Sequence, residues 1–506
     1  MNNLPLLSII ILLPIIASII IFLLPKKNDK TILSVALIFS SLVFIVLLLI
    51  LFKFETKLYP NTNNIFQFAE NFTIIDLSST ITDALTINYA IGIDGISLIF
   101  IFFTVITIPF LFLTINGEKE KLKSNIFLTL LLSSTLIGLF TSTDLLCFYV
   151  FFEITYLILF LLIKNQNSIK TNKRFSFSFY LHIFSSLIFL IFIWGLNQSS
   201  HEILDNGYVV NSFNLSTFYQ ISNYTPDGIL SPFNPNNLRV ITFIFLVIAL
   251  IIKIFVLPFR YFLKENNHFI VIISQILIAK VGFYILIKII IPIFSELIPL
   301  YFHIIANVGI VLFALFSIKI ILTDSLNKFI INLSFLYFSM IFVGIGLNTN
   351  ESIVGAIQHI FNHSIIFLGL FYCLYLYKKE KSLESFREKS ISIYIRIFPI
   401  ILLFALIAFP GLSSFTSQYL ILKSILINYH IIIFIVTLIA IILIFFKAIN
   451  LVKVENKILI GFTYSTKIIR YEYIILIPIL SLIIYLGICP NYIIKIISTF
   501  IHYFVQ

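Results

Sequence analysis

The sequence predicts an all-α polytopic membrane protein with about 14 transmembrane helices, including two inverted repeats of about five helices each. Of the 506 residues, 60% are hydrophobic and only 11% are charged, whereas a soluble domain carries about 25% charged residues. Apolar runs of about 20 residues, long enough to cross a bilayer, recur along the chain. Lys and Arg collect in alternate connections between these runs. The composition therefore excludes a soluble enzyme, a nucleic-acid-binding protein and a disordered regulator.

The apolar runs give the order of the predicted helices. Two longer polar stretches, 53–95 and 197–237, are rich in Asn, Ser and Thr and are expected to be loops on one membrane face. The first run lacks a basic leader and a small-residue cleavage site, so we interpret it as a retained helix. The predicted spans are 5–24, 31–52, 96–115, 125–142, 144–163, 175–196, 238–262, 269–294, 299–318, 329–347, 351–377, 397–426, 429–450 and 471–496.

The distribution of basic residues supports this number of spans. The odd-numbered connections and the span ends next to them hold 24 of the 33 Lys and Arg residues, whereas the even-numbered connections and their adjoining span ends hold only Lys53, Lys57 and Arg239. Short loops on the cytoplasmic side of membrane proteins carry such an excess of Lys and Arg. Both termini are therefore expected on the opposite face. The net charge of +11 thus reports orientation rather than nucleic-acid binding.

Helix-breaking residues predict the repeat. Pro258 lies in one span, and Pro410 and Gly411 lie in another span five helices later. Proline removes a backbone donor and glycine weakens a helix, so both spans are expected to be broken. Matching broken helices indicate an inverted-repeat transporter, although ordinary kinks are the alternative. The predicted divisions are 1–124 for three N-terminal helices, 125–295 for the first repeat, 296–452 for the second repeat and 453–506 for the last helix.

Ionisable residues inside the spans are candidates for function, because their burial in a bilayer is costly. They are Glu153, Lys253, Lys280 and His363. No basic residue lies near Glu153 on its own helix, so its counter-ion is expected from another helix, with Lys253 the best candidate. Such a lysine can exchange protons, and a static ion pair is the alternative. Lys280 is interpreted as a relay, and His363 as a proton carrier or an ordinary hydrogen-bonded histidine.

Other chemistry is not indicated. Three lysines nearer the ends of their spans are expected to extend their ammonium groups to the interface; they are Lys288, Lys447 and Lys495. The three cysteines lie far apart, without the spacing of a metal-binding motif. The sequence contains no Gly-rich nucleotide-binding motif and no HExxH motif. We therefore expect no cofactor on this chain.

Seven stretches of the chain resemble motifs of the antiporter-like, proton-pumping subunits of respiratory complex I, in particular the branch that includes mitochondrial subunit 4. Together they extend from about residue 89 to residue 425. The resemblance implies a subunit that couples quinone reduction elsewhere in the complex to proton transfer across the membrane. The stretches are Tyr89–Leu98, Asp144–Glu153, Lys253–Leu263, Ile276–Tyr284, Thr323–Gly346, Gly355–His363 and Phe409–Leu422.

The resemblance also implies roles and partners. Glu153 and Lys253 would form a pair, Lys280 the central relay, and His363 a step towards the second half-channel. NADH, FMN, iron–sulfur clusters and ubiquinone would be bound elsewhere in the complex. The partners would be membrane lipids and other membrane-arm subunits, including neighbouring antiporter-like subunits. The expected location is the mitochondrial inner membrane, with both termini on the intermembrane-space side. A skew towards Phe, Ile, Asn and Lys, typical of AT-rich genes, agrees with an organellar gene.

The sequence departs from the family pattern at several positions. Gln418 stands where these subunits usually carry a glutamate, and a glutamine can orient water but cannot release a proton. Tyr337 stands where histidine is frequent, and Arg260 and Asn267 replace two further histidines. Lys423, five residues after Gln418, is a candidate substitute carrier, and the alternative is a lysine that extends to the interface.

Two other functions stay open. One is a stand-alone or Mrp-type cation/proton antiporter, against which the organellar composition weighs. The other is a structural membrane-arm subunit with impaired transport. Gln418 and Tyr337 support this second alternative, whereas Glu153, Lys253 and Lys280 oppose it.

Overall fold

The computed structural model divides into two compact units, Met1–Tyr261 with Leu277–Leu297 and Phe262–Ile276 with Ile298–Gln506. The boundary between them falls inside one helical stretch, 268–293. The predicted division into four segments stays a prediction. The structure describes residues 4–25, 28–56, 66–76, 86–115, 121–166, 172–200, 202–203, 209–210, 213–220, 223–225, 227–233, 238–256, 268–383, 394–428, 431–460 and 476–501.

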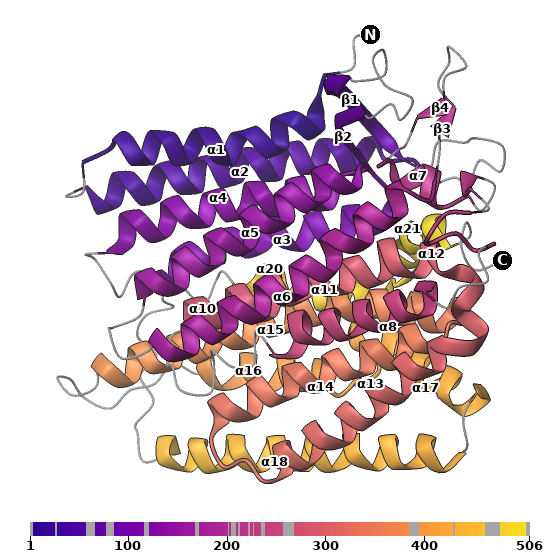
Figure 1. Ribbon diagram of the computed structural model, residues 1–506. Helices are drawn as coiled ribbons and strands as arrows, with labels where there is room; N and C mark the ends of the chain where they lie inside the picture. The colour runs from indigo at the N-terminus through magenta and orange to yellow at the C-terminus, as the bar shows by residue number, and fades with distance from the viewer. Residues whose placement is uncertain are drawn as a thin grey trace. The chain divides into compact units, whose positions relative to one another are not determined.

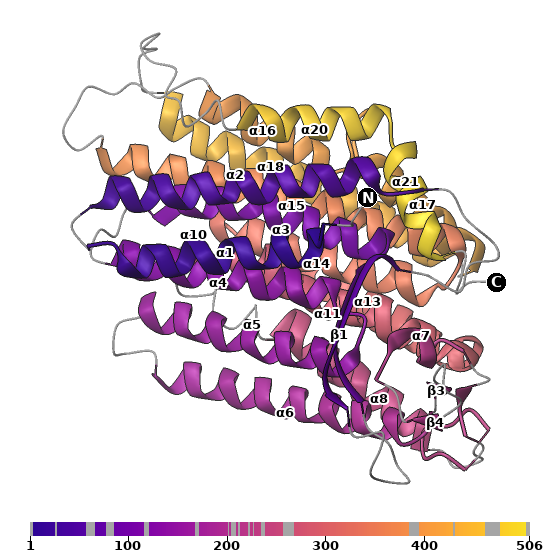
Figure 2. The same cartoon turned by 90° about the horizontal axis from the view of Figure 1, so that it is seen from above.

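The first unit contains long helices, two small antiparallel sheets and several π-helical segments (Figures 1 and 2). Its helices up to residue 197 are α1 (Leu6–Leu23), α2 (Asp29–Lys53), α3 (Gly95–Thr114), α4 (Leu122–Thr141), α5 (Leu145–Gln166) and α6 (Asn172–Asn197). Its strands are β1 (Gln67–Asp76), β2 (Thr86–Ile93), β3 (Glu202–Ile203) and β4 (Val209–Val210). The remaining elements are α7 (Leu215–Phe218), α8 (Leu238–Ile251), the π-helix η5 (Ile252–Val256), α11 (Ala279–Ile285), the π-helix η7 (Leu286–Ile290), α12 (Ile291–Ile293) and the short η8 (Ser295–Leu297).

Helices are the only regular secondary structure among the described residues of the second unit. It begins with α10 (His268–Ile272) and most of the π-helix η6 (Ile273–Ile278). The helices that follow are α13 (Ile298–Ile321), α14 (Leu326–Gly346), α15 (Asn350–Leu383), α16 (Tyr394–Leu406), α17 (Ser414–Asn428), α18 (Ile431–Ile460), α20 (Leu476–Ile488) and α21 (Asn491–Ile501).

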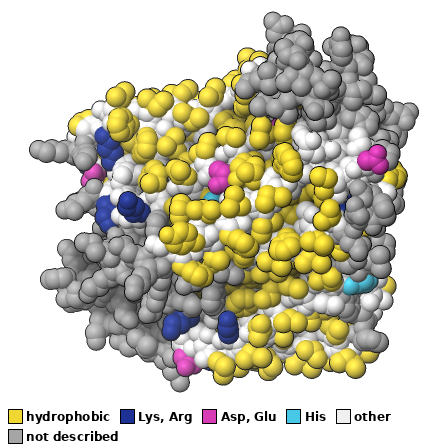
Figure 3. Space-filling view, in the orientation of Figure 1, with side chains coloured by type: hydrophobic (Ala, Val, Ile, Leu, Met, Phe, Trp, Pro, Cys, Tyr) yellow, Lys and Arg dark blue, Asp and Glu magenta, His cyan; other side chains and the backbone are white. Residues whose placement is uncertain are grey.

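The described helices confirm an all-α polytopic membrane protein. Twelve of them are long and apolar enough to cross a membrane, and the bent pair α20–α21 raises this number to 13. Helices satisfy their backbone hydrogen bonds internally, as a bilayer requires. Hydrophobic side chains cover much of the face drawn in Figure 3. The fourteenth span stays a prediction, because α16 and α17, which occupy most of 397–426, are each shorter than a full crossing.

The polar stretch 53–95, expected to be a loop, contains the antiparallel hairpin β1–β2. Its second strand has buried residues at Ala90, Ile91 and Ile93. The carbonyl of Ala90 accepts a hydrogen bond over 3.0 Å from the backbone N–H of Thr143, between α4 and α5. The hairpin thus packs on the ends of the helices. This packing stabilises strands that are too polar to be predicted from hydropathy.

The hairpin also holds the start of α1. The carboxylate of Glu70, on β1, accepts a hydrogen bond from the backbone N–H of Leu7 over 3.0 Å, and it contacts both the N–H and the hydroxyl of Ser8. The first amides of a helix lack partners within the helix and attract negative charge. Glu70 therefore fixes the first helix to a strand that lies about 60 residues later in the chain.

The chain leaves helical structure between Leu406 and Ser414, at the Pro410-Gly411 pair. Gly411 has a φ of +88°, a conformation that favours glycine. Proline cannot supply the donor that would continue α16. The other predicted break, at Pro258, lies outside the described residues, as do Arg260 and Asn267. On its N-terminal side, α8 passes directly into the π-helix η5.

The last predicted span, 471–496, is not a single straight helix. Its described part is the pair α20–α21, which is bent by 77°. Pro490 lies at the bend, and its ring removes the backbone donor that a continuous helix would need there. The sequence prediction overlooked this proline.

Candidate functional site

The start of α5 is fixed by Asp144. Its Oδ1 accepts hydrogen bonds from the backbone N–H groups of Leu146 (2.8 Å) and Cys147 (2.9 Å), which have no acceptor within the helix. Glu153 lies in the middle of this helix, and Tyr156 follows three residues later on the same face. The cap therefore sets the rotation with which α5 presents both side chains to α6.

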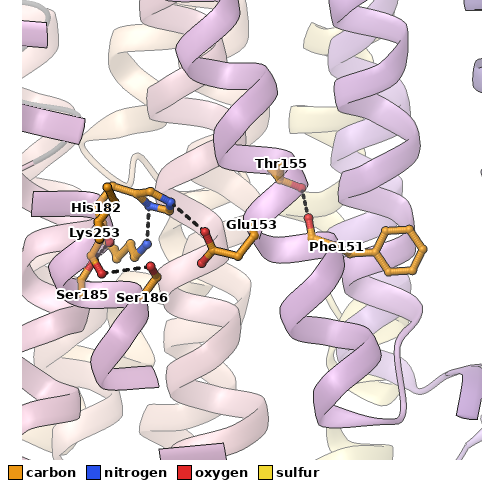
Figure 4. Close-up of polar contacts among 8 residues, drawn as sticks. Phe151, Glu153, Thr155, His182, Ser185, Ser186 and Lys253 are labelled. Carbon is orange, nitrogen blue, oxygen red and sulfur yellow. Dashed lines mark hydrogen bonds and ion pairs between the residues drawn. The ribbon is translucent and has the colours of Figure 1, made fainter. Parts of the chain in front are cut away.

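Glu153 and Lys253 are joined through a histidine. Oε2 of Glu153 lies 3.2 Å from Nε2 of His182 on α6. The other ring nitrogen of His182, Nδ1, lies 2.6 Å from Nζ of Lys253 in η5 (Figure 4). Lys253 thus faces Glu153 from another helix as expected, but the contact runs through an imidazole because α6 packs against both α5 and η5.

Aromatic rings hold this group in place. Nζ of Lys253 lies 4.2 Å from the ring centre of Phe152 and 4.1 Å from that of Tyr156. The Tyr156 ring also stacks on His182, with centroids 4.4 Å apart. Cation–π contacts stabilise an ammonium group that has lost its water. Lys253 and His182 are each only 3% exposed, whereas the Glu153 side chain is 35% exposed.

The contacts allow a neutral His182 to bridge the two charged groups. A neutral imidazole can accept a hydrogen bond from the Lys253 ammonium at Nδ1 and donate its Nε2–H to the Glu153 carboxylate. If Lys253 passes a proton to Nδ1 while Nε2 passes one to Glu153, the imidazole stays neutral and changes tautomer. Lys253 and Glu153 then both become neutral. The three groups can therefore hold a proton at either end without charging the histidine.

Lys280 is fully buried at the start of α11. A Cβ atom on Gly282 would lie only 2.4 Å from Cγ1 of Ile254, so the glycine lets α11 approach η5 closely. The segments that carry Lys253 and Lys280 therefore pack against each other within the first unit. This packing is compatible with the relay role expected for Lys280.

His363 lies in the second unit, in a chain of neutral polar groups. Its Nε2 is 2.7 Å from the hydroxyl of Ser334 on α14, which donates to Oε1 of Gln275 over 2.8 Å. The imidazole also stacks on Phe367, with centroids 4.3 Å apart. His363, Ser334 and Gln275 are all buried. The arrangement allows the imidazole to donate to Ser334, so these two contacts need no charge on the histidine.

Tyr337 and Gln418 contact each other at the broken helix. The Gln418 amide donates to the carbonyl of Leu406 (2.9 Å) and to the Tyr337 hydroxyl (3.2 Å). The Tyr337 hydroxyl also donates to the Leu406 carbonyl, which belongs to the last residue of α16. The Tyr337 ring stacks on His359 with centroids 4.2 Å apart. The two departures from the family pattern thus form one matched set that satisfies a carbonyl freed by the break.

Lys423 does not join this set. Its ammonium lies 2.7 Å from Oε1 of Glu351, and the two side chains are 40% and 46% exposed. Lys447 likewise pairs with an exposed carboxylate, that of Asp324, over 3.3 Å. Lys423 is therefore part of a surface ion pair, one and a half helical turns beyond Gln418.

The expectation that Lys288 extends to the interface is wrong. Lys288 is fully buried and pairs with the carboxylate of Asp94, directly before α3. A lysine near the end of a span is drawn inward when a buried carboxylate offers a better partner than the interface.

Sequence reasoning also missed His182, His359 and Asp94. His182 lies inside an apolar span, so the criterion applied to His363 would have found it. His359 lies one turn before His363 and meets the same criterion. Asp94 precedes a span rather than lying within it, and no local signal marks its partner. In the part of the chain that the structure describes, no three His, Cys, Asp or Glu side chains lie together as a metal site requires.

A family model supplies the assignment of the chain. The model for the transmembrane region of the NADH:quinone oxidoreductase/Mrp antiporter proteins matches residues 142–444. The chain belongs to this family. The matched region contains Glu153, His182, Lys253 and Gln418, whereas Asp94 lies before it.

The chain is similar to relatives and to solved structures over nearly its whole length. NADH-quinone oxidoreductase subunit M of Rickettsia conorii is 26% identical over 522 residues, which cover 98% of each chain. NADH-ubiquinone oxidoreductase chain 4 of Chondrus crispus is 26% identical over 497 residues, 95% of this chain and 93% of the relative. A chain of respiratory complex I from Thermus thermophilus with bound NADH has the same fold, with a TM-score of 0.75, 17% identity and 99% coverage of both chains.

Proposed function

We propose that this chain is a proton-translocating membrane-arm subunit of NADH:ubiquinone oxidoreductase, of the chain 4 type. The observation that carries the proposal is the Glu153–His182–Lys253 group, with His182 and Lys253 buried and Glu153 half-buried, which can move a proton between two helices of the bundle. The names of full-length relatives, subunit M and chain 4, support the same assignment. The chain would work as part of the enzyme, and the redox groups NADH, FMN, iron–sulfur clusters and ubiquinone would be bound by other subunits.

In the proposed mechanism, quinone reduction elsewhere in the complex changes whether the proton is held by Glu153 or by Lys253. When Glu153 is ionised, the His182 bridge favours a protonated Lys253. When Glu153 takes up the proton, Lys253 becomes neutral and can accept another from the neighbouring segment that carries Lys280. The charge that moves through His182 thus controls whether Lys280 can pass its proton on. His363 would be a step further along, in the second unit.

The proposed location is the mitochondrial inner membrane, with both termini on the intermembrane-space side. The chain 4 relative and the AT-type composition support the organelle. The collection of Lys and Arg in alternate connections supports the orientation. Protease accessibility of a C-terminal tag in intact inner-membrane vesicles of known orientation tests it. A tag accessible from the matrix side contradicts the orientation.

The test of the function is Glu153→Gln in the intact complex, reconstituted into vesicles. The amide can hydrogen-bond to His182 but cannot accept its proton, so we expect fewer protons moved per electron. The control is Glu55→Gln, at an exposed glutamate beyond the end of α2. A Glu153→Gln complex that keeps the full proton-to-electron ratio would contradict the proposal and favour a structural subunit with impaired transport.

The second candidate function, an Mrp-type cation/proton antiporter, rests on the scope of the family itself. Native electrophoresis of solubilised membranes, with NADH activity staining and peptide identification, distinguishes the two. An NADH:ubiquinone oxidoreductase subunit migrates within a very large NADH-oxidising assembly. Migration in a smaller assembly without NADH activity would favour the antiporter.

A further inference from the structure

A second buried ion pair lies in the first unit, on elements other than those that carry Glu153. The ammonium of Lys288, in η7, pairs with Oδ2 of Asp94, directly before α3. The exposed fractions of the two side chains are 0% and 4%. The two residues are 194 positions apart in the chain. The pair therefore connects two distant elements, and both of its side chains are almost fully enclosed by the protein.

The contacts of this pair exceed what a helix cap needs. Oδ1 of Asp94 accepts a hydrogen bond from the backbone N–H of Ser97 over 2.8 Å, and this contact alone caps α3. Asn, Ser or Thr would provide the same cap. Oδ2 remains for Lys288, whose Nζ also lies 4.5 Å from the centre of the Phe66 ring. The Tyr219 hydroxyl donates to the backbone carbonyl of Lys288 over 2.8 Å.

Energetics indicate that the pair has a role other than stabilising the fold. Replacing a buried ion pair by apolar residues of similar volume is often neutral or stabilising, so stability alone does not explain its presence. Lys288 also lies in a π-helical segment, as Lys253 does. Short π-helical segments are rare and occur frequently at functional sites. Both lysines thus combine an unusual backbone, an aromatic contact and an indirect or direct carboxylate partner.

A polar stripe connects the ion pair with Lys280. Lys280, Tyr284 and Lys288 recur every four residues and so lie along one face of the stretch 279–290. The two lysines are about two helical turns apart along this stretch. The Tyr284 hydroxyl between them donates to the backbone carbonyl of Phe140 over 3.0 Å and lies 3.0 Å from the hydroxyl of Ser97. The backbone N–H of Ser97 donates to Asp94. All these side chains are buried.

The topology gives this stripe a direction. Asp94 directly follows β2, in the connection between α2 and α3. Lys288 lies five residues before Ile293, where its span ends. The α2–α3 connection is one of those poor in Lys and Arg, which places it on the face opposite to the basic loops. The stripe therefore runs from mid-span towards the Lys- and Arg-poor face.

We propose that Asp94 and Lys288 form the terminal proton-exchange site of the first unit, which links Lys280 to the Lys- and Arg-poor face of the membrane. This inference rests on the proposed function. A proton that leaves Lys280 along this stripe neutralises the Asp94 carboxylate. Lys288, without its counter-ion, then releases a proton to water on that face, and Asp94 returns its own proton to the Lys288 amine. One proton enters, one leaves, and the ion pair is restored.

The decisive variant is Lys288→Arg in the intact complex. Arginine keeps the positive charge and the ion pair but does not release a proton in proteins. A purely structural pair would tolerate this change, whereas a proton-exchange site would not. We expect the proton-to-electron ratio in vesicles to fall at least as far as with Glu153→Gln. The control is Lys319→Arg, at an exposed lysine of α13.

A second variant keeps the test decisive if the larger arginine prevents assembly. Asp94→Asn retains an acceptor for the Ser97 N–H and nearly the same shape, and its control is Asp324→Asn at an exposed position. We expect an assembled complex with the same low ratio. An assembled variant of either kind with the full ratio overturns the inference. Failure of Asp94→Asn to assemble also overturns it, by assigning the pair a structural role. If Glu153→Gln keeps the full ratio as well, the proposed function fails instead.

Discussion

The two units fill their polar interiors with different kinds of group. The first unit buries Asp94, Asp144, Arg239, Lys253, Lys280 and Lys288, and Glu153 is half-buried. Among the described residues of the second unit, no Asp, Glu, Lys or Arg side chain is buried. The buried polar side chains there are mainly those of histidine, tyrosine, serine, asparagine and glutamine. Both units therefore have polar interiors, but only the first keeps residues that carry a full charge at neutral pH.

The difference has a physical consequence. A buried ion pair changes its net interactions strongly when one proton moves, because the partner is left uncompensated. A chain of neutral donors and acceptors, such as Gln275–Ser334–His363, gains or loses little when its hydrogen bonds reverse direction. Moving one proton therefore changes the electrostatic interactions more in the first unit than in the second.

The variant with the largest expected effect is His182→Gln. A glutamine side chain can contact Glu153 or Lys253 but cannot transfer a proton between them. General acid–base groups contribute about 100-fold or more to proton-transfer rates, so transfer through the site should fall far below turnover. The proton-to-electron ratio should match that of Glu153→Gln. The control is His303→Gln, at an exposed histidine of α13. A full ratio in an assembled His182→Gln complex would assign His182 a packing role only.

Gln418→Glu tests whether the second unit tolerates a charge. A carboxylate cannot donate to the Leu406 carbonyl, and the described second unit offers no buried cation to compensate it. The lost donor and the added acceptor should cost about 1–3 kcal/mol. We expect a lower midpoint of thermal dissociation of the complex, with an unchanged proton-to-electron ratio. Gln418→Met, which removes the donors without adding an acid, is the matched comparison. A rise in the ratio would contradict the comparison, because the second unit would then exchange protons once an acid is present.

The smallest effect is expected at Lys423. If this lysine receives protons on the surface of the second unit, Lys423→Met lowers the proton-to-electron ratio more than Lys447→Met does. Both lysines form exposed ion pairs, so the two variants remove comparable interactions. Reconstituted complexes at the same salt concentration provide the measurement. Equal and negligible effects would exclude a role for Lys423.

The sequence predicts the spans well because the length of each apolar run can be counted directly from the residues. It also places Glu153, Lys253 and Lys280 inside the bundle, since the criterion is only that a charge interrupts an apolar run. The bridge through His182 is not predictable in this way, because it depends on the rotation of three helices relative to one another. The hairpin β1–β2 is not predicted for a similar reason. Its stability comes from packing on helix ends rather than from its own residues.

Lys288 illustrates the limit most clearly. Its position near the end of a span favours an extended side chain that reaches the interface. The structure turns it inward because Asp94, 194 residues earlier, lies beside it. Distance from the end of a span therefore predicts only which side chains can reach water. Which of them do so depends on partners that no local pattern encodes.

The contact between Glu70 and the start of α1 has a consequence for biogenesis. The first helix emerges from the ribosome long before the strand that carries its cap, because the two contact points lie 63 residues apart. Until that strand has been synthesised, the amides of Leu7 and Ser8 have no carboxylate partner. The N-terminal helix is therefore expected to remain loosely docked during insertion and to lock only after the second helix and the hairpin have followed. An arrest-peptide series with nascent chains that end before and after residue 70 would detect this step as a late gain in compactness.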